Sequence, residues 1–235
     1  MNAGITRRQA LTLGALGIGA LAAGATGLVI SELGSRVSGS ETSTPAPDPS
    51  GSMGVTGWSQ PSVLESAGGV LDITLEVAER EVPVGGEPVR MLTYNGTVPG
   101  PTLHVRPGDL LRVRLQNDLV DHTNLHTHGL LVSASDSGDN PFVRIAPGEG
   151  FDYEIQLPDD HPAGVFWYHP HHHGLVADQL FAGLYGALVV DEEDWSQAPP
   201  RIAVVSDVTI ADGTVVTVSG VDRMRGRTGE VLLVN

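Results

Sequence analysis

The feature that most restricts the fold of this chain is a repeated alternation of apolar and polar side chains. Residues 70–77 alternate in this way, and the same period of two returns at residues 111–115 and 151–157. Successive side chains of a strand point to opposite faces of a sheet, so each segment is expected to be a half-buried strand. Turn signals rich in Gly, Pro and Asn separate the segments, at residues 95–96, 99–101, 106–109 and 146–150. Short strands between such turns predict an all-β sandwich.

This sandwich is predicted to occupy residues 61–195. Its last strand is expected at Leu184–Val190, and a short helix is expected at Ala177–Ala182. The acidic run Asp191–Asp194, with the prolines that follow it, is predicted to mark a domain edge.

Residues 196–235 are too few to form a core of their own. Strand-like patterns begin again at Arg201–Val205 and Val215–Val218. We therefore expect this segment to be the first strands of a second domain that is incomplete in this chain.

The first 30 residues have the pattern of an export leader. Arg7 and Arg8 precede an uncharged run from Leu11 to Ile30 that is built largely from Ala, Gly and Leu. This pattern predicts a twin-arginine signal or a membrane anchor, and therefore a periplasmic, cell-surface or extracellular location. Residues 31–60 are rich in Ser, Thr, Pro and Gly and are predicted to be a disordered linker.

Charge and cysteine content exclude several classes of function. The formal charge is −15 and all 13 basic residues are arginines, so we expect no nucleic-acid binding. The chain has no cysteine, which excludes disulfides, thiolate zinc sites and any copper centre that needs a thiolate. An acidic surface of this kind suits solubility and cationic partners such as metal ions.

Two His-x-His pairs are the strongest functional signal in the sequence. His126 and His128 form one pair, and His169 and His171 form the other after a strand-like Val165–Tyr168. Residues i and i+2 of a strand share a face, so two imidazoles spaced in this way can reach one metal ion or two adjacent ions. Imidazole is a ligand for copper, zinc, nickel and iron, and two such pairs on one sandwich predict a metal site.

Two other folds that use His-x-His on strands fit less well. A cupin needs a glutamate a few residues after the first pair, but the first glutamate after His128 is Glu149. A zinc site like that of carbonic anhydrase needs three histidines and leaves the second pair without a role.

Four segments resemble a known family: Tyr94–Thr102, Asn124–Gly129, Trp167–Gly174 and Ala182–Val190. Their order and spacing resemble the first, plastocyanin-like cupredoxin domain of the laccase-like bacterial multicopper oxidases, over about residues 70–190. The resemblance implies a cupredoxin-like Greek-key β-sandwich with copper as its cofactor.

The resemblance also implies a role for each histidine of the two pairs. It places His126 on the type 2 copper and His128, His169 and His171 on the type 3 coppers of a trinuclear cluster. His173 lies where the family has a residue that contacts the ligands rather than the metal. No catalytic residue separate from the metal ligands is expected.

The remaining histidines and the nearby carboxylates receive simpler interpretations. Four histidines are expected to be structural or solvated: His104, His122, His161 and His172. Three carboxylates near the motifs are expected to be solvated loop residues: Asp136, Asp139 and Asp178.

Measured against the family, the chain lacks a cysteine for type 1 copper and half of the cluster ligands. We therefore expect the N-terminal domain of a truncated or split multicopper oxidase, an oxidoreductase that uses dioxygen as acceptor. Its partners would be copper ions and the missing cupredoxin domains or another subunit. Two alternatives remain open: an exported copper-binding or buffering module without redox turnover, and a metal-free interaction domain.

Overall fold

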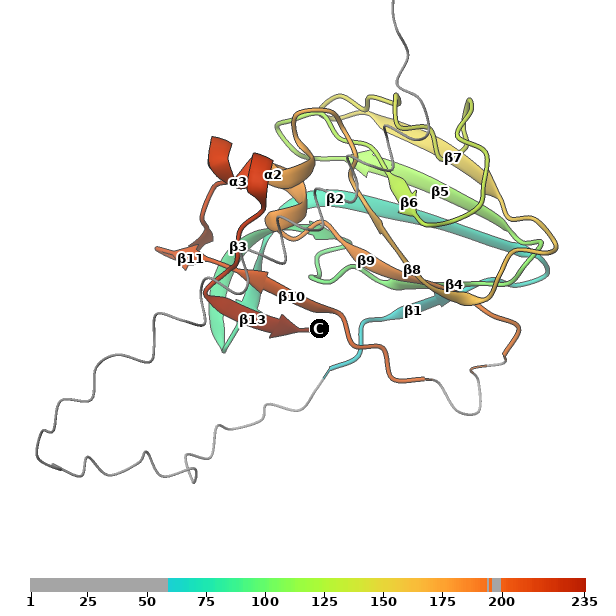
Figure 1. Ribbon diagram of the computed structural model, residues 1–235, viewed down its shortest axis with the longest axis horizontal. Coiled ribbons are helices and arrows are strands. Elements are labelled where there is room, and N and C mark those ends of the chain that lie inside the picture. Colours follow the sequence, from blue (N-terminus) through green and yellow to red (C-terminus); the bar gives the residue numbers. More distant parts are fainter. Residues whose placement is uncertain (1–58, 194, 196–199) are drawn as a thin grey trace, which may run out of the picture. The chain divides into compact units, whose positions relative to one another are not determined.

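The computed structural model describes residues 59–193, 195 and 200–235. The predicted leader, residues 1–30, and nearly all of the predicted linker, residues 31–60, lie outside the described residues. Within the described part, strands dominate and two short helices are present (Figure 1). No helix in that part is long and apolar enough to cross a membrane.

One layer of the molecule is a six-stranded sheet in the order β11, β12, β3, β2, β5, β7. Strand β2 pairs antiparallel with β3 and parallel with β5, and β5 pairs antiparallel with β7. The bounds are β2 Val70–Val84, β3 Glu87–Tyr94, β5 Leu110–Asn117, β7 Gly150–Gln156, β11 Ile210–Ala211 and β12 Thr214–Val215.

A five-stranded sheet in the order β1, β4, β9, β8, β6 forms the second layer. Its first three strands are parallel, whereas β8 pairs antiparallel with both β9 and β6, which leaves β6 at one edge. The bounds are β1 Val63–Glu65, β4 Thr102–Val105, β6 His126–His128, β8 Gly164–His169 and β9 Gly186–Val190. Helix α2, Val176–Phe181, lies between β8 and β9 in the sequence.

The core between the two sheets is made by the alternating side chains that the sequence predicted. In β5 Leu111, Val113 and Leu115 are buried, while the arginines between them are exposed. Tyr153 and Ile155 of β7 are buried on the same side. Strand β9 is buried along its whole length, as expected for a strand in the middle of a sheet, here between β4 and β8. The predicted all-β, cupredoxin-like sandwich is confirmed.

Five elements, β10 to β13 and α3, follow the sandwich in the sequence, and Figure 1 shows them together near the C-terminus. Strand β10, Val205–Val208, pairs antiparallel with β13, Val231–Val234, and α3 spans Gly220–Arg225. Strand β12 pairs with β3, so this segment also extends the six-stranded sheet. The proposed boundary between residues 195 and 196 stays a prediction.

The two strands predicted in this segment are shifted or shortened. Strand β10 begins at Val205, not at Arg201, because side chains bind the backbone before it. The N–H of Ile202 donates to Gln60 Oε1, and the N–H of Val204 donates to Asn235 Oδ1. The second predicted strand, Val215–Val218, is reduced to Thr214–Val215. Such side chains take hydrogen bonds that a neighbouring strand would otherwise accept. The alternation of apolar residues does not predict them.

Replacing Gly186 with alanine tests the packing beneath β8. Gly186 pairs with Tyr168, and a Cβ at Gly186 would overlap the buried Tyr168 ring, whose hydroxyl donates to Pro101 O at 2.7 Å. We expect Gly186→Ala to lower the free energy of unfolding by about 1 to 3 kcal/mol, because the ring cannot move without losing that bond. Urea unfolding measures the change. Gly220→Ala, where an added Cβ meets open space, is the control and should stay within about 0.5 kcal/mol.

Candidate metal centre

The two His-x-His pairs meet through the register of strands β6 and β8. His126 lies directly opposite His169, and His128 lies directly opposite Trp167. Because side chains two residues apart share a face, these four rings form one square patch on the same side of the sheet. Thr127, between the two histidines of β6, points to the other side and is buried.

Three imidazoles of this patch converge. One ring nitrogen each of His126, His128 and His169 lies within 4.8 Å of the other two. Nδ1 of His128 and Nε2 of His169 are 3.4 Å apart. Two nitrogens bonded to one ion at about 2 Å each lie roughly 3 to 4 Å apart, so this spacing fits imidazoles that share a metal.

His171 lies beside the three converging rings without belonging to their strands. Its ring centre is 5.1 Å from that of His126 and 6.1 Å from that of His169. Asn124 fixes this position, since its Oδ1 accepts a hydrogen bond from the His171 N–H at 2.6 Å while its Nδ2 donates to Pro141 O and Val143 O. The motif containing Asn124 was recognised in the sequence, but this positioning role was missed.

A hydrogen-bond partner on the Nδ1 side of the ring orients two of the imidazoles. Nδ1 of His126 lies 2.9 Å from Oδ2 of Asp139, and Nδ1 of His169 lies 2.8 Å from the carbonyl oxygen of Pro170. When these Nδ1 atoms carry the proton, Nε2 of each ring is free to bind a metal. A carboxylate or carbonyl behind a ligating histidine is the usual arrangement around bound metals.

The expectation that Asp139 is a solvated loop carboxylate is wrong. Asp139 is only 8% exposed, and its Oδ1 also accepts a hydrogen bond from the Thr127 N–H at 2.9 Å. It therefore fixes both the ring of His126 and the backbone of β6. No local pattern marks Asp139, because the contact is made by a loop that returns to the strand. Asp178 is not free either, since it forms an ion pair with Arg223.

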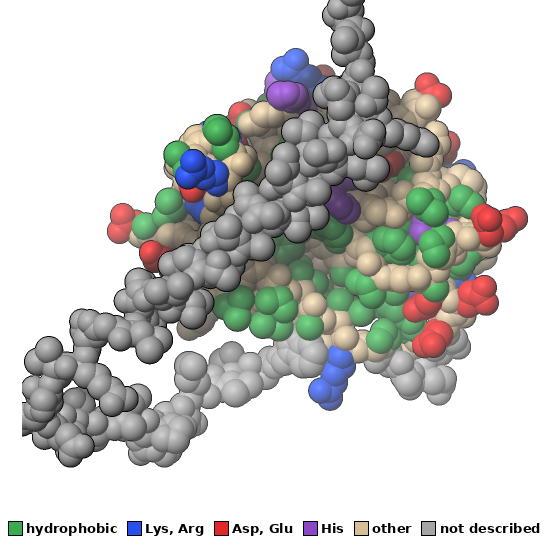
Figure 2. Space-filling view, viewed as in Figure 1, with side chains coloured by type: hydrophobic (Ala, Val, Ile, Leu, Met, Phe, Trp, Pro, Cys, Tyr) green, Lys and Arg blue, Asp and Glu red, His purple; other side chains and the backbone are tan. Residues whose placement is uncertain are grey.

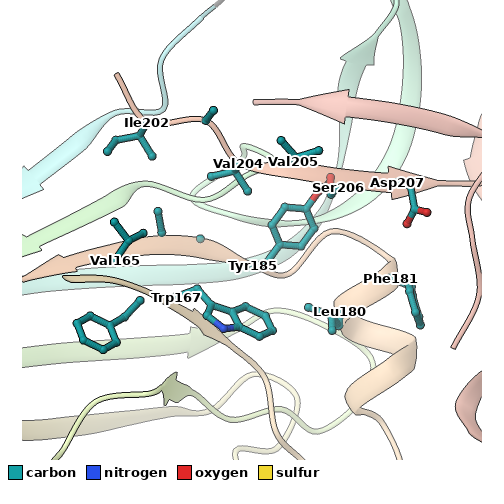
Figure 3. A pocket seen from close by; sticks show the side chains of 14 residues that line it. Val165, Trp167, Leu180, Phe181, Tyr185, Ile202, Val204, Val205, Ser206 and Asp207 are labelled. Atoms are coloured by element: carbon teal, nitrogen blue, oxygen red, sulfur yellow. Dashed lines mark hydrogen bonds between the residues drawn. The ribbon is translucent and has the colours of Figure 1, made fainter. Parts of the chain in front are cut away.

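Trp167 completes the patch as its fourth corner. Its indole stacks on His169 with ring centres 4.1 Å apart and on His128 with ring centres 4.9 Å apart. Trp167 also lines an apolar pocket of about 450 Å³, together with Leu180, Tyr185 and Val204 (Figure 3). The indole thus lies between the histidines and that pocket and limits the tilt of two imidazole planes.

Burial keeps the central imidazole neutral. His169 is 4% exposed, and this burial lowers its pKa from 6.5 to about 4, with His126, His128 and His171 adding to the lowering. A neutral ring offers its nitrogen lone pair to a metal at neutral pH. His128 and His171, by contrast, are exposed, so the group of four histidines is open on one side.

The other histidines divide into buried and surface residues. His104 is fully buried on β4, where it stacks on Trp195 and lies 2.7 Å from Asp191 Oδ1. His161 is also buried and accepts a hydrogen bond from the Leu131 N–H. Structural roles for both agree with the sequence interpretation. His173 is exposed, and its expected contact with the ligands stays a prediction.

Comparison with known sequences agrees with this geometry. The profile of the family described as "Multicopper oxidase" matches residues 76–194, which is half of the chain. The chain belongs to the multicopper oxidase family. Copper is the metal that this family implies, and four neighbouring imidazoles are a suitable set of ligands for it.

The chain matches only part of the length of each relative. Multicopper oxidase MmcO of Mycobacterium tuberculosis is 36% identical over 127 residues, which are 54% of this chain and 24% of that protein. Copper resistance protein A of Escherichia coli is 29% identical over 68% of this chain and 27% of its own length. The chain therefore spans about a quarter of the length of these relatives.

A solved structure shows the same fold. The multicopper oxidase of Campylobacter jejuni, described as a metallo-oxidase, superposes with a TM-score of 0.63 and 30% identity. The superposition covers 75% of this chain and 40% of that protein.

Replacing Asp139 with asparagine tests the orientation of His126. Asparagine keeps the shape but removes the charge that holds the Nδ1 proton of His126, so we expect the affinity for copper to fall by about 10- to 100-fold. Competition against a chromophoric chelator measures the affinity. Asp136→Asn, an exposed residue of the same loop, is the matched control. Equal affinities for the two variants would contradict a role for Asp139 behind the ligand.

In the metal-free protein, the free energy of unfolding should fall as the pH drops from about 6.5 toward 4. Unfolded His169 binds a proton near its ordinary pKa of about 6.5, whereas the folded ring stays neutral down to about pH 4. The unfolded state therefore binds more protons in this window and is favoured as the pH falls. Urea unfolding at steps from pH 7 to pH 4 measures the decline, which should be shallower in His169→Gln. The same slope in both proteins would assign the decline to other groups.

Proposed function

We propose that this chain is the copper-binding N-terminal cupredoxin domain of a multicopper oxidase and supplies half of a trinuclear copper cluster. The observation that carries the proposal is the convergence of His126, His128 and His169 on one face of β6 and β8, with His171 beside them. In this proposal His126 binds the type 2 copper, and His128, His169 and His171 bind the type 3 coppers.

The openness of the site supports the claim of a half cluster. His128 and His171 are exposed, whereas His169 is buried, so the group of proposed ligands is open to solvent at two of its members. A second domain with its own imidazoles would close this side. When bound, copper would carry electrons from a reducing substrate to dioxygen, and the complete enzyme would be an oxidoreductase with dioxygen as acceptor.

The residues around the ligands have defined tasks in this proposal. Asp139 and the carbonyl of Pro170 hold protons on the Nδ1 atoms of His126 and His169, so that Nε2 of each ring stays available. Asn124 holds the backbone of His171 in place. Trp167 covers the side of the rings that faces the apolar pocket and excludes water there.

The remaining parts of the enzyme come from outside this chain. Type 1 copper needs a cysteine thiolate, which the sequence lacks, so further cupredoxin domains or another subunit supply that site. Figure 2 shows hydrophobic side chains gathered where β9, β10 and β13 lie in Figure 1. Val205 and Leu232 are 62% and 70% exposed there, which provides apolar surface for such a partner. In this proposal the twin-arginine pattern directs export, so that the protein acts outside the cytoplasm.

Removing two of the four histidines tests the proposed site. We expect His126→Ala combined with His169→Ala to lose most of the copper bound at the candidate metal centre, because one ligand is lost from each strand. Thr127→Val is the control, since Thr127 lies between the ligands but its buried hydroxyl has no hydrogen-bond partner. Elemental analysis and electron paramagnetic resonance of the folded, copper-loaded protein measure the effect.

The result separates the proposal from its alternatives. Copper bound by the wild type without oxidase activity is the expected outcome for half a cluster that needs further domains. Restored turnover with a partner that contributes a type 1 site supports the oxidase, and continued inactivity with every such partner supports a copper-binding module. An unchanged copper content in the double variant overturns the assignment of the ligands.

A further inference from the structure

A second pair of histidines lies outside the candidate metal centre. The ring centres of His122 and His172 are 6.0 Å apart, and both side chains are partly exposed. In five of the six pairs formed by the four histidines of the candidate centre, the same distance ranges from 5.1 Å to 6.1 Å. The surface histidine pair, His122 and His172, is therefore spaced as closely as the rings of the candidate centre.

The start of helix α2 holds both members of this pair. The N–H of Leu175 donates to the carbonyl oxygen of His172 at 3.0 Å, and Nε2 of Gln179 donates to the carbonyl oxygen of His122 at 2.8 Å. Leu175 and Gln179 are themselves joined by a helical hydrogen bond, and Gln179 is buried and bound by the hydroxyl of Thr123. Two segments about 50 residues apart in the sequence are thus fixed to one turn of helix, which presets their separation.

One ring has a free nitrogen lone pair, and the lone pair of the other is shared with an arginine. Nδ1 of His172 lies 3.1 Å from the carbonyl oxygen of His173, so a proton on Nδ1 leaves the lone pair on Nε2. Nη2 of Arg144 donates to Nδ1 of His122 at 3.5 Å, so the lone pair of His122 lies on Nδ1. Arg144 therefore competes with a metal ion for the lone pair of His122, and its positive charge repels a cation there. A variant without this charge should bind the ion more tightly.

An acidic hollow borders the same helix turn. Asp118 and Asp121 line a pocket of about 230 Å³ together with Leu175 and Gln179. Asp178 and Glu79 line it as well, but they are paired with Arg223 and Arg90. The two remaining carboxylates give this side of the pair a negative potential that attracts cations.

We propose that the surface histidine pair binds one copper(I) ion. A metal–nitrogen bond of about 2 Å on each side places two imidazole centres on one ion at most roughly 6 Å apart, which matches the observed spacing. Two neutral imidazoles suit copper(I), which accepts two ligands, whereas zinc in proteins takes four. His172 adjoins His171, so the ion is held one residue from the candidate metal centre. A role in loading that centre rests on the proposed function, but binding by the pair does not.

A titration of the folded chain with copper(I) tests the proposal. Under anaerobic conditions, competition against bicinchoninate counts the ions bound by the chain and gives their affinities. We expect His122→Ala combined with His172→Ala to bind one copper(I) fewer than the wild type and to keep the ions of the candidate centre. The reverse loss is expected for His126→Ala combined with His169→Ala, so the two sites fail independently.

Arg144 supplies a test in the opposite direction. Arg144→Gln removes a positive charge near His122, and we expect affinity for the surface ion to rise about fivefold. Arg112→Gln, an exposed arginine of β5 paired with Glu154, is the matched control and should leave the affinity unchanged. The proposal is overturned if the surface double variant binds as much copper(I) as the wild type, or if Arg144→Gln and Arg112→Gln have the same affinity.

Discussion

The candidate metal centre depends on the register of one antiparallel strand pair. With His126 opposite His169 and His128 opposite Trp167, three imidazoles and an indole occupy one face of β6 and β8. A slip by one residue would turn every side chain of β6 to the other face and bring Thr127 to the site. That register in turn rests on the antiparallel pairing of β8 with β9 in the interior of the sheet.

Loop residues fix the positions of the histidines that strands β6 and β8 bring together. Asp139 reaches back from its loop to hold both the His126 ring and the Thr127 N–H, and Asn124 joins the His171 backbone to the neighbouring loop. Both side chains are buried, so their hydrogen bonds lie in a medium where polar contacts are strong and unpaired groups are costly. The candidate ligands are therefore held in place by the protein's own hydrogen bonds.

One side of the candidate metal centre is buried and the other is exposed to solvent. Burial and stacking on Trp167 keep His169 neutral and fixed, whereas His128 and His171 face solvent. Such an arrangement can receive ions and further ligands from one direction only. The surface histidine pair shares its supporting helix turn with an acidic hollow, and His172 adjoins His171 in the sequence.

The sequence by itself determined the sandwich and the identity of the histidines. Alternation in residues 111–115 and 151–157 predicts buried strand faces because the period of two is a property of adjacent residues. The spacing of His126 and His128 likewise places both rings on one face. The short helix after His173 and the structural roles of His104 and His161 were also predictable from local pattern.

Only the tertiary structure decided which of these groups meet. The register between β6 and β8 selects Trp167 as the fourth corner, and a returning loop turns Asp139 from an expected solvated carboxylate into a buried partner of His126. Before β10, the N–H groups of Ile202 and Val204 donate to the side chains of Gln60 and Asn235. Local periodicity cannot encode such contacts, because they join residues far apart in the sequence and depend on how the sheets and loops pack.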